Sequence, residues 1–443
     1  MAESKGARAD PKKEFFIDVL TMDIDYKSCI LDLIDNSVDA FTKTRRVAGN
    51  IKINFSEDSL EIYDDCGGIK ETDLLETVFR FGGHIERTGE DILGIYGIGL
   101  KRAIFKIGNA FEFESYDGKD HNIVYEDDLS KWKERDTGGI ETWRFKVRKG
   151  TPREKKGYSR LRIYKLKDAY KKIPTLKEQI SRDIRIKYVM FMNEGLSFHV
   201  NGVLIEPMSY GMPNTAVLEP AVKMIQQGDL RIKIICGYNP RASDKAREKP
   251  PEGKYGWNIF CNNRLILLDD TTASTGWGES GNTAFHTLYY PFSGYVWINS
   301  KDVSKLPVNT TKTGLVTSHE TYKLVLKEMW ALANPILSYI YKVRLLEEGS
   351  AIDEAEEAAA EQVSEDAEKM DVNSNQKSIF ELNEEKEFKA PLASKKKREV
   401  SRIQYDKPIR EIEIMKKRMR VKSKKKVGEK SFEYYLEQEC GGI

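Results

Sequence analysis

The segment that most restricts how this 443-residue chain can fold lies near its amino end, where residues 30–40 read ILDLIDNSVDA. Apolar residues recur at helical spacing from Tyr26 to Thr42, which predicts an amphipathic helix. A helix in that register places Asp32, Asn36 and Asp39 on one face. Carboxylates on a helix, including Asp35 here, most often form a solvated surface. This segment alone therefore leaves that simpler interpretation open.

Two further segments follow in order and at close spacing. Residues 62–69 read IYDDCGGI and residues 94–101 read GIYGIGLK. A glycine-containing segment taken alone is more often a turn than a phosphate-binding loop. Motifs become informative when their context agrees, and the three segments together predict a pocket for a magnesium nucleotide.

The chemistry of a triphosphate explains why these residue types are needed. A triphosphate requires a cation, backbone donors and compensating charge. Mg²⁺ prefers oxygen ligands and keeps several waters, so the amide oxygen of Asn36 suffices beside the phosphates. Asp32, one turn earlier, is placed to hold and deprotonate a water aimed at the terminal phosphate. Asp64, at the end of an apolar strand, is a candidate acceptor for the exocyclic amine of adenine.

Glycines precede a second predicted helix that begins near Leu100. Gly94, Gly97 and Gly99 allow backbone N–H groups to approach an anion closely. The amino end of the following helix favours negative charge. Lys101 is a candidate phosphate contact, although a surface position on the helix is an equally good interpretation.

The three segments resemble the N-box, the DxGxG-type box and the glycine-rich lid of the GHKL ATPase superfamily, over roughly residues 15–165. That superfamily includes DNA gyrase B subunits, heat-shock chaperones, histidine kinases, MutL proteins and MORC ATPases. GYSRLRI stands where members carry a Gly-Thr near the adenine, which implies that Ser159 lies beside Asp64. The resemblance implies bound ATP and Mg²⁺, with Asn36 as the Mg²⁺ ligand. The implied ATP contacts are Asn36, Asp64, Gly68, Ile69, Gly94, Tyr96, Gly97, Ile98, Gly99, Leu100, Lys101 and Ser159.

The resemblance to MutL and MORC extends further along the chain. PVNTTKTGL resembles the MutL loop that sends a lysine to the terminal phosphate, which makes Lys312 a candidate catalytic residue with Asp32. The preceding YGWNIFCNNRLIL resembles the strand pair with an NR-type turn in the same transducer domain. Taken without that resemblance, Lys312 is a surface lysine by default.

Two positions depart from the family pattern. Members usually carry glutamate as the general base, whereas this chain has the shorter Asp32. Cys66 occupies the first glycine position of the second box. Either the shorter aspartate acts through a shifted water, or hydrolysis is very slow while ATP binding survives; we expect slow turnover.

Composition divides the chain into four parts. We predict a GHKL ATP-binding α/β sandwich over residues 1–205 and a transducer-like α/β domain with the lysine loop over residues 206–346. An acidic flexible linker is expected over 347–394, because residues 347–371 carry eleven acids and one lysine. A basic, partly disordered helical tail is expected over 395–443, where residues 395–426 carry fifteen Lys or Arg and four acids.

Other sequence features limit compartment and partners. No apolar run reaches the ~18 residues of a membrane span, and the start lacks the apolar segment of a secretory signal. Five scattered cysteines fit reduced thiols in the cytoplasm and argue against a structural zinc. The basic tail predicts nucleic-acid contact through counterion release, although such runs often serve solubility alone.

We therefore expect a slow Mg-dependent ATPase that forms an ATP-dependent homodimer and acts as a clamp or switch on DNA or on an unknown protein partner. The alternative is a chaperone-like ATPase that remodels a protein client. A histidine kinase is excluded, because no histidine precedes His84 to accept a phosphoryl group upstream of the N-box. The sequence after residue 346 leaves too little room for a MutL-type endonuclease domain.

Overall fold

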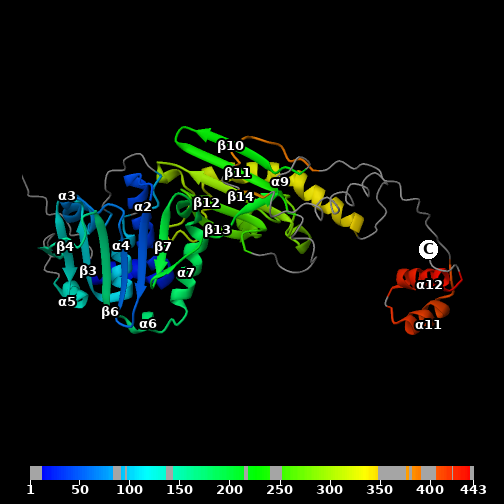
Figure 1. Cartoon of the computed structure of the whole chain (residues 1–443), viewed down its shortest axis with the longest axis horizontal. Helices are drawn as coiled ribbons and strands as arrows, with labels where there is room; N and C mark the ends of the chain where they lie inside the picture. Colours follow the sequence, from blue (N-terminus) through cyan, green and yellow to red (C-terminus); the bar gives the residue numbers. More distant parts are fainter. Residues whose placement is uncertain are drawn as a thin grey trace, which may run out of the picture. The chain divides into compact units, whose positions relative to one another are not determined.

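The computed structural model describes residues 12–82, 91–94, 97–135, 143–213, 218–239, 252–347, 376–378, 382–390, 406–421 and 423–439. The chain divides into two compact units, Met1–Ser394 and Lys395–Ile443. The first unit contains two large β-sheets with their helices, and the second contains a pair of helices (Figure 1).

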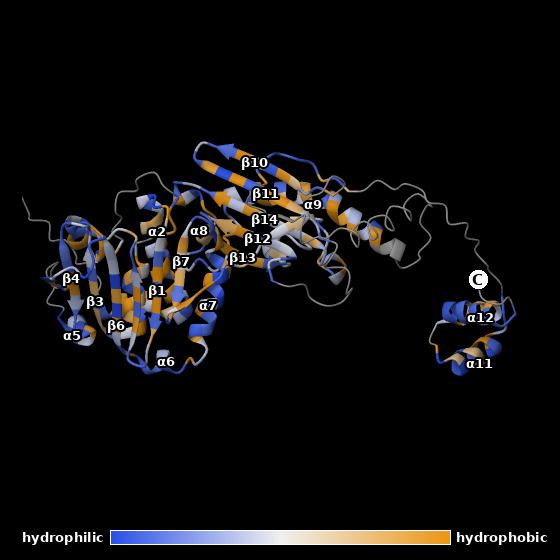
Figure 2. Ribbon diagram, in the orientation of Figure 1, coloured by the Kyte–Doolittle hydropathy of each residue, from blue (hydrophilic) through white to orange (hydrophobic). Residues whose placement is uncertain are grey.

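Eight strands form the first sheet, in the order β5-β4-β3-β6-β2-β1-β7-β8. Their bounds are β1 Gly49–Phe55, β2 Ser59–Asp64, β3 Gly108–Tyr116, β4 His121–Glu126, β5 Lys146–Lys149, β6 Tyr158–Leu166, β7 Leu196–Val200 and β8 Val203–Leu204. Adjacent strands run antiparallel except β1 and β7, which are parallel. Apolar and polar residues alternate along these strands, so one face is buried and the other is polar (Figure 2).

Helices pack against the apolar face of this sheet. Their bounds are α1 Lys13–Met22, α2 Tyr26–Thr44, α3 Glu71–Asp73, α4 Gly99–Ile107, α5 Leu129–Glu134, α6 Asp168–Lys171, α7 Leu176–Lys187 and α8 Val189–Asn193. A π-helical turn, Leu74–Val78, continues directly from α3. Helices α2 and α4 pack against each other and against the sheet, and α7 contacts both α2 and β7. A large cluster of apolar side chains fills the core between the helices and the sheet.

Helix α2 carries the segment that most restricted the fold. Its first turn is capped by the Asp25 side chain, which accepts a hydrogen bond from the Ser28 amide at 2.6 Å. It ends at Arg45, whose φ of +48° is left-handed. Ile30, Ile34 and Val38 recur every four residues and are fully buried, which fixes the rotation of the helix against the sheet.

The second sheet has five strands in the order β10-β11-β14-β12-β13. Their bounds are β10 Ala221–Gln227, β11 Leu230–Tyr238, β12 Gly256–Cys261, β13 Arg264–Asp270 and β14 Phe292–Asn299. The long helix α9, Glu320–Glu347, packs on β11 and β14. Short 3₁₀ turns lie at Ala273–Thr275, Thr287–Tyr289 and Val303–Lys305. The two mixed sheets with their helices confirm the predicted α/β class, with an α/β sandwich followed by a further α/β domain.

Two segments of residues 347–394 differ from the expected flexible linker. Strand β15, Gln376–Ser378, pairs with β9, Gly211–Pro213. Residues 382–390 run along β10 through backbone bridges Glu219↔Lys389 and Val222↔Lys386. Leu382 and Phe388 pack against the apolar side chains of the second sheet. The acidic residues 347–371 contain no aromatic side chain. These apolar contacts explain why the segment departs from the behaviour that its acidic composition predicts.

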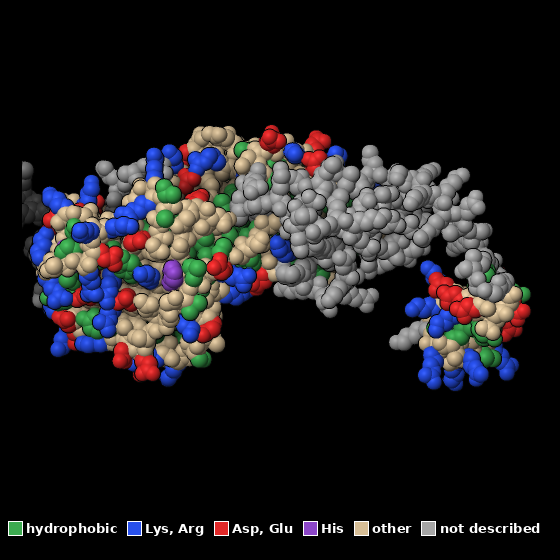
Figure 3. All heavy atoms as spheres, in the orientation of Figure 1, with side chains coloured by type: hydrophobic (Ala, Val, Ile, Leu, Met, Phe, Trp, Pro, Cys, Tyr) green, Lys and Arg blue, Asp and Glu red, His purple; other side chains and the backbone are tan. Residues whose placement is uncertain are grey.

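The second unit is a pair of helices, α11 Ile409–Met419 and α12 Lys424–Glu439. Val427 on α12 is buried, and most other side chains of the pair are exposed. Lys and Arg side chains gather along one edge of this unit (Figure 3). Throughout the described ranges, every helix is too short or too polar to cross a membrane.

Candidate functional site

One cavity of about 380 Å³ collects the side chains that the sequence singled out. It lies between α2, the amino end of α4, the strands β2, β3 and β6, and a loop of the second sheet's domain. Predicted site residues that line it are Asp32, Asn36, Asp64, Gly68, Ile69, Gly94, Gly97, Ile98, Gly99, Leu100, Lys101, Ser159 and Lys312. Tyr96 and the predicted lid residues 83–90 lie outside the described residues.

Asn36 faces the cavity from the middle of α2. Every other residue from Ser28 to Asp39 is buried, whereas Asn36 is exposed and lines the cavity. A polar side chain at the only exposed position in this stretch is available to a ligand rather than to the core. No cluster of three or more His, Cys, Asp or Glu suited to a metal occurs among the described residues. Asn36 supplies one oxygen ligand, so a Mg²⁺ ion bound to it needs phosphate and water oxygens to complete its coordination.

The glycine segment closes over the helix α2 at one end of the cavity. Both oxygens of Asp39 accept backbone hydrogen bonds, from Leu93 N at 2.6 Å and from Gly94 N at 2.7 Å. A Cβ at Gly94 would meet Asp39 Oδ2 at 2.9 Å, and Gly97 has a φ of +61°. This end therefore requires glycine for close approach and for left-handed backbone. Burial raises the pKa of Asp39 to about 6, against these hydrogen bonds.

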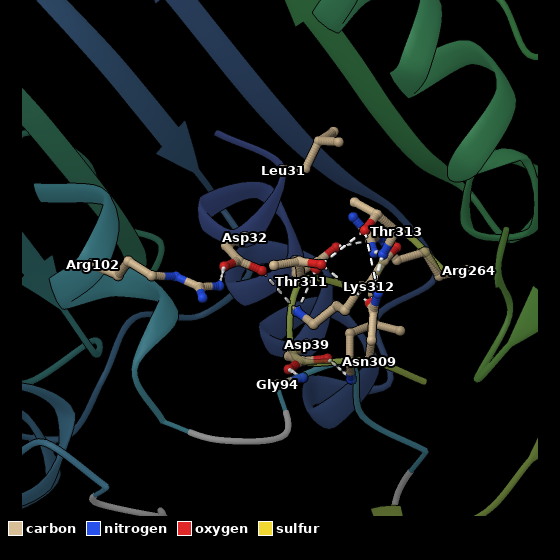
Figure 4. Close-up of polar contacts among 12 residues, drawn as sticks. Leu31, Asp32, Asp39, Gly94, Arg102, Arg264, Asn309, Thr311, Lys312 and Thr313 are labelled. Carbon is tan, nitrogen blue, oxygen red and sulfur yellow. Dashed lines mark hydrogen bonds and ion pairs between the residues drawn. The ribbon is translucent and has the colours of Figure 1, made fainter. Parts of the chain in front are cut away.

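Asp32 is held by two cations at the same end (Figure 4). Arg102 of α4 donates through Nη2 to Asp32 Oδ2 at 2.5 Å, and Lys312 Nζ lies 3.2 Å from Asp32 Oδ1. Arg102 and Asp32 are 6% and 4% exposed. Gly99, the first residue of α4, packs so closely that a Cβ there would lie 3.2 Å from Asp32. Asp32, the candidate base, thus lies directly against the amino end of α4.

Asp35 is buried, contrary to the solvated face expected for it. It accepts from Tyr188 Oη at 2.7 Å and pairs with Arg264 Nε at 2.9 Å and with Lys312 Nζ at 2.6 Å. Burial acts to raise its pKa, but Arg264 and Lys312 hold the pKa of Asp35 below its usual range. Asp35 and Asp32 in turn hold the pKa of Lys312 above its usual range, although burial acts to lower it. The helical register brings Asp35 toward the second sheet, where these cations replace solvent.

Lys312 reaches the cavity from a tight loop. The loop is closed by the bridge Val308↔Leu315 and by the Asn309 side chain, which accepts from Thr313 N at 3.0 Å. Lys312 has a left-handed φ of +54°, and its carbonyl accepts from Arg264 Nη1 at 3.3 Å. The surface position considered for Lys312 is therefore wrong, because its side chain is buried between the two sheets.

A fourth carboxylate, Asp64, lies at the other end of the cavity and accepts hydrogen bonds from neutral groups. Ser37 Oγ donates to Asp64 Oδ2 at 2.9 Å, and the Cys66 amide donates to Asp64 Oδ1 at 3.1 Å. Ser159 of β6 lies directly opposite Asp64 in the antiparallel pair. Burial raises the pKa of Asp64 to about 7. This end suits an uncharged ligand that donates hydrogen bonds.

The turn after Asp64 explains how a cysteine is tolerated in the second box. Gly67 and Gly68 have φ of +132° and +71°, whereas Cys66 is not left-handed. A Cβ at Gly68 would lie 1.9 Å from the Tyr116 carbonyl oxygen. Glycine is therefore required at Gly68, and the first position accepts a buried thiol without backbone strain.

The Lys101 side chain is buried, and its Nζ donates to a backbone carbonyl instead of pairing with a carboxylate. It is 2% exposed, lines the cavity, and donates to the Val78 carbonyl at 2.9 Å. Burial lowers its pKa to about 8. The surface interpretation of Lys101 is wrong, because α4 turns this side chain under the π-helical turn.

Four residues of the site were not predicted from the sequence: Asp35, Arg102, Tyr188 and Arg264. Arg264 belongs to the NR-type turn already noted, so a signal for it was present. Arg102 follows the glycine segment by only three residues but carries no motif of its own. Tyr188 lies in the turn between α7 and α8 and gives no signal in the sequence.

With this geometry in hand, comparison with known families decides what the first domain is. Residues 24–150 match the family of histidine kinase-, DNA gyrase B- and HSP90-like ATPases. Residues 24–150 form a GHKL-type ATPase domain. Domains of this family bind ATP, so the match supports ATP binding here. No curated protein matches the chain. Ser159 and Lys312 lie beyond the matched residues and line the same cavity, and Arg264, also beyond them, pairs with Asp35 of the matched domain.

Proposed function

We propose that this chain is a slow Mg-dependent ATPase whose nucleotide site is completed by the second α/β domain, and that it works as an ATP-gated dimeric clamp or switch. The observation that carries the proposal is the shared cavity. Within it, Asn36, Asp32, the amino end of α4 and Lys312 of the second domain surround one end, and Asp64 with Ser159 lies at the other.

Asn36 is the proposed protein ligand for Mg²⁺, which when bound neutralises phosphate charge. Asp32 is the proposed general base. It accepts a proton from water as the water oxygen attacks the terminal phosphorus, and the bond from that phosphorus to the bridging oxygen breaks to give ADP and inorganic phosphate. Aspartate is one methylene shorter than glutamate, so its carboxylate sits farther from the water, and slow turnover is expected.

The decisive test is isothermal titration with ATP and Mg²⁺ on the full chain, against Asn36→Ala. We expect uptake by the unmodified chain and a loss of affinity of at least about a hundredfold in Asn36→Ala, because the metal loses its only side-chain ligand. Asn54→Ala is the matched control, since Asn54 is exposed on the polar face of the first sheet. An unmodified, folded chain that takes up no ATP contradicts the proposal.

Exposed apolar side chains on α1 support the dimer. Phe15, Val19 and Met22 follow helical spacing and are 67%, 49% and 71% exposed. Such a stripe is typical of a surface that a partner covers. If dimerisation tightens ATP binding, ATP must tighten the dimer by the same factor. Sedimentation with and without a non-hydrolysable ATP analogue tests this, and Val19→Glu should prevent the increase in mass. An unchanged mass with the analogue counts against the dimer.

Basic side chains at the turn of the C-terminal helix pair support nucleic-acid contact. They flank the turn on both helices: Lys416, Lys417, Arg418, Arg420, Lys424, Lys425 and Lys426. Seven cations at one turn favour phosphate backbones through counterion release. Removing residues 395–443 should weaken DNA binding and reduce its salt dependence. An unchanged salt slope would assign the contact elsewhere.

A further inference from the structure

Arg102 and Lys312 approach the candidate base from opposite sides (Figure 4). Arg102 engages Asp32 Oδ2 and Lys312 engages Asp32 Oδ1. Each oxygen of Asp32 is thus occupied by a cation, so a water approaching this carboxylate must compete with Arg102 and Lys312 for it. We call this arrangement the masked state of Asp32.

These contacts belong to a longer row of alternating charges. It runs Arg102, Asp32, Lys312, Asp35, Arg264, with every neighbouring pair in contact. All five residues are at most 7% exposed. The row contains three cations and two carboxylates, and a third buried carboxylate, Asp39, acts electrostatically on Lys312.

Arg102 also has an unused donor. Its Nε is buried and has no hydrogen-bond partner within the described part of the chain. Buried donors of this kind usually find a partner. Arg102 and Lys312 both line the nucleotide cavity, at the end where the glycine segment and α4 begin. The missing partner is therefore expected to be an anion that enters this cavity.

We propose that Arg102 is a ligand of the terminal phosphate of ATP, and that this phosphate draws Arg102 and Lys312 away from Asp32 and so unmasks the base. The inference rests on the proposed function. A terminal phosphate carries more charge than a carboxylate and accepts paired hydrogen bonds from a guanidinium. ADP lacks that group, so Asp32 stays paired when ADP is bound. The base becomes free only when there is a phosphate to remove.

Arg264 keeps the lysine loop in place during this exchange. It holds the Lys312 carbonyl at 3.3 Å and pairs with Asp35 at 2.9 Å. Only the Lys312 side chain needs to move from Asp32 toward the phosphate. The proposal thus requires rotation of two side chains and no displacement of either sheet.

The test compares affinities for the non-hydrolysable analogue AMPPNP and for ADP, both with Mg²⁺, by titration calorimetry on the full chain. In Arg102→Gln, AMPPNP affinity should fall about tenfold to a hundredfold, which is the range for one charge-assisted hydrogen bond. ADP affinity should stay within about twofold and also reports that the variant is folded. In Asp32→Asn, AMPPNP affinity should rise by about fivefold, because the phosphate no longer competes with a carboxylate for the two cations.

Lys106→Gln is the matched control. Lys106 lies on the same helix α4, but its Nζ donates to the Thr21 carbonyl at 2.8 Å and it does not line the cavity. Both affinities should be unchanged in this variant.

The outcomes separate the two hypotheses. An Arg102→Gln variant that weakens AMPPNP and ADP equally, or neither, overturns the phosphate-ligand role. An Asp32→Asn variant that binds AMPPNP more weakly than the unmodified chain overturns the masking. Failure of the unmodified chain to bind either nucleotide instead rejects the proposed function itself.

Discussion

The two ends of the cavity, which we propose to hold the phosphates and the adenine of ATP, hold carboxylates in opposite ways. At the phosphate end, Asp32 and Asp35 are surrounded by Arg102, Lys312 and Arg264. At the adenine end, Asp64 accepts hydrogen bonds only from neutral groups among the described residues. Ion pairs outweigh burial for Asp35, whose pKa is lowered, whereas burial dominates for Asp64, whose pKa rises to about 7.

This difference matches the two halves of the expected ligand. An anionic phosphate must compete with carboxylates for cations, so the charged end responds to whether the phosphate is present. A neutral base that donates hydrogen bonds is best met by an acceptor without a cation beside it. Identical side chains on one helix and one strand thus acquire separate tasks from their partners, and each task can be tested by changing one partner.

The largest expected effect is on turnover at the phosphate end. Asp32→Asn removes the proposed base and should lower the rate of phosphate release from ATP by about 10²- to 10⁴-fold. Nucleotide binding should persist. Asp58→Asn, in an exposed turn of the first sheet, is the control and should leave the rate unchanged. Full turnover by Asp32→Asn would assign the base to another residue.

The next effect is on stability, through the cation that pairs with Asp35. Arg264→Gln leaves a buried carboxylate with one cation instead of two, and the free energy of unfolding should fall by about 3–5 kcal/mol. Urea denaturation measures it. Arg162→Gln, exposed on β6, should change stability by at most about 0.5 kcal/mol. Equal losses in both variants would show that the buried row adds nothing to folding.

At the adenine end, we expect a smaller effect on recognition. Asp64→Asn replaces a pure acceptor by an amide and should weaken ATP binding by about tenfold to a hundredfold. Selectivity for ATP over GTP should fall with it, because the exocyclic amine of adenine loses its acceptor. Competition titrations with both nucleotides check this. Retained selectivity would place base recognition on other groups.

The smallest effect is the pH dependence of that recognition. Because the pKa of Asp64 is raised to about 7, its ionised fraction grows between pH 6 and pH 8, and ATP affinity should rise roughly tenfold over that interval. Asp64→Asn should remove this part of the rise. The same shift has the opposite sign for folding: the folded chain binds the proton more tightly, so Asp64 lowers stability as pH increases from about 4 to about 7.

How far the sequence predicted this site depends on the kind of contact. Motif residues such as Asn36, Asp64 and Gly97 were found because phosphate and adenine chemistry restricts their types and spacing. The position of Ser159 beside Asp64 was expected from the resemblance, and the β2–β6 register places it there. The partners of Asp35 were not predicted, because Tyr188 and Arg264 come from distant elements and meet Asp35 only after the two sheets pack. Long-range ion pairs leave no period or spacing in one sequence.

The loop that carries Lys312 has a practical consequence for anyone dividing the chain. A fragment cut at residue 205 would keep the whole region that matches the family, yet it would remove Arg264 and Lys312, the two cations paired with Asp35. It would also uncover Ile186 and Val189, which pack against the second sheet, so such a fragment should be poorly soluble. Expression trials that respect the family boundary would then fail, and a cut beyond α9 should rescue them.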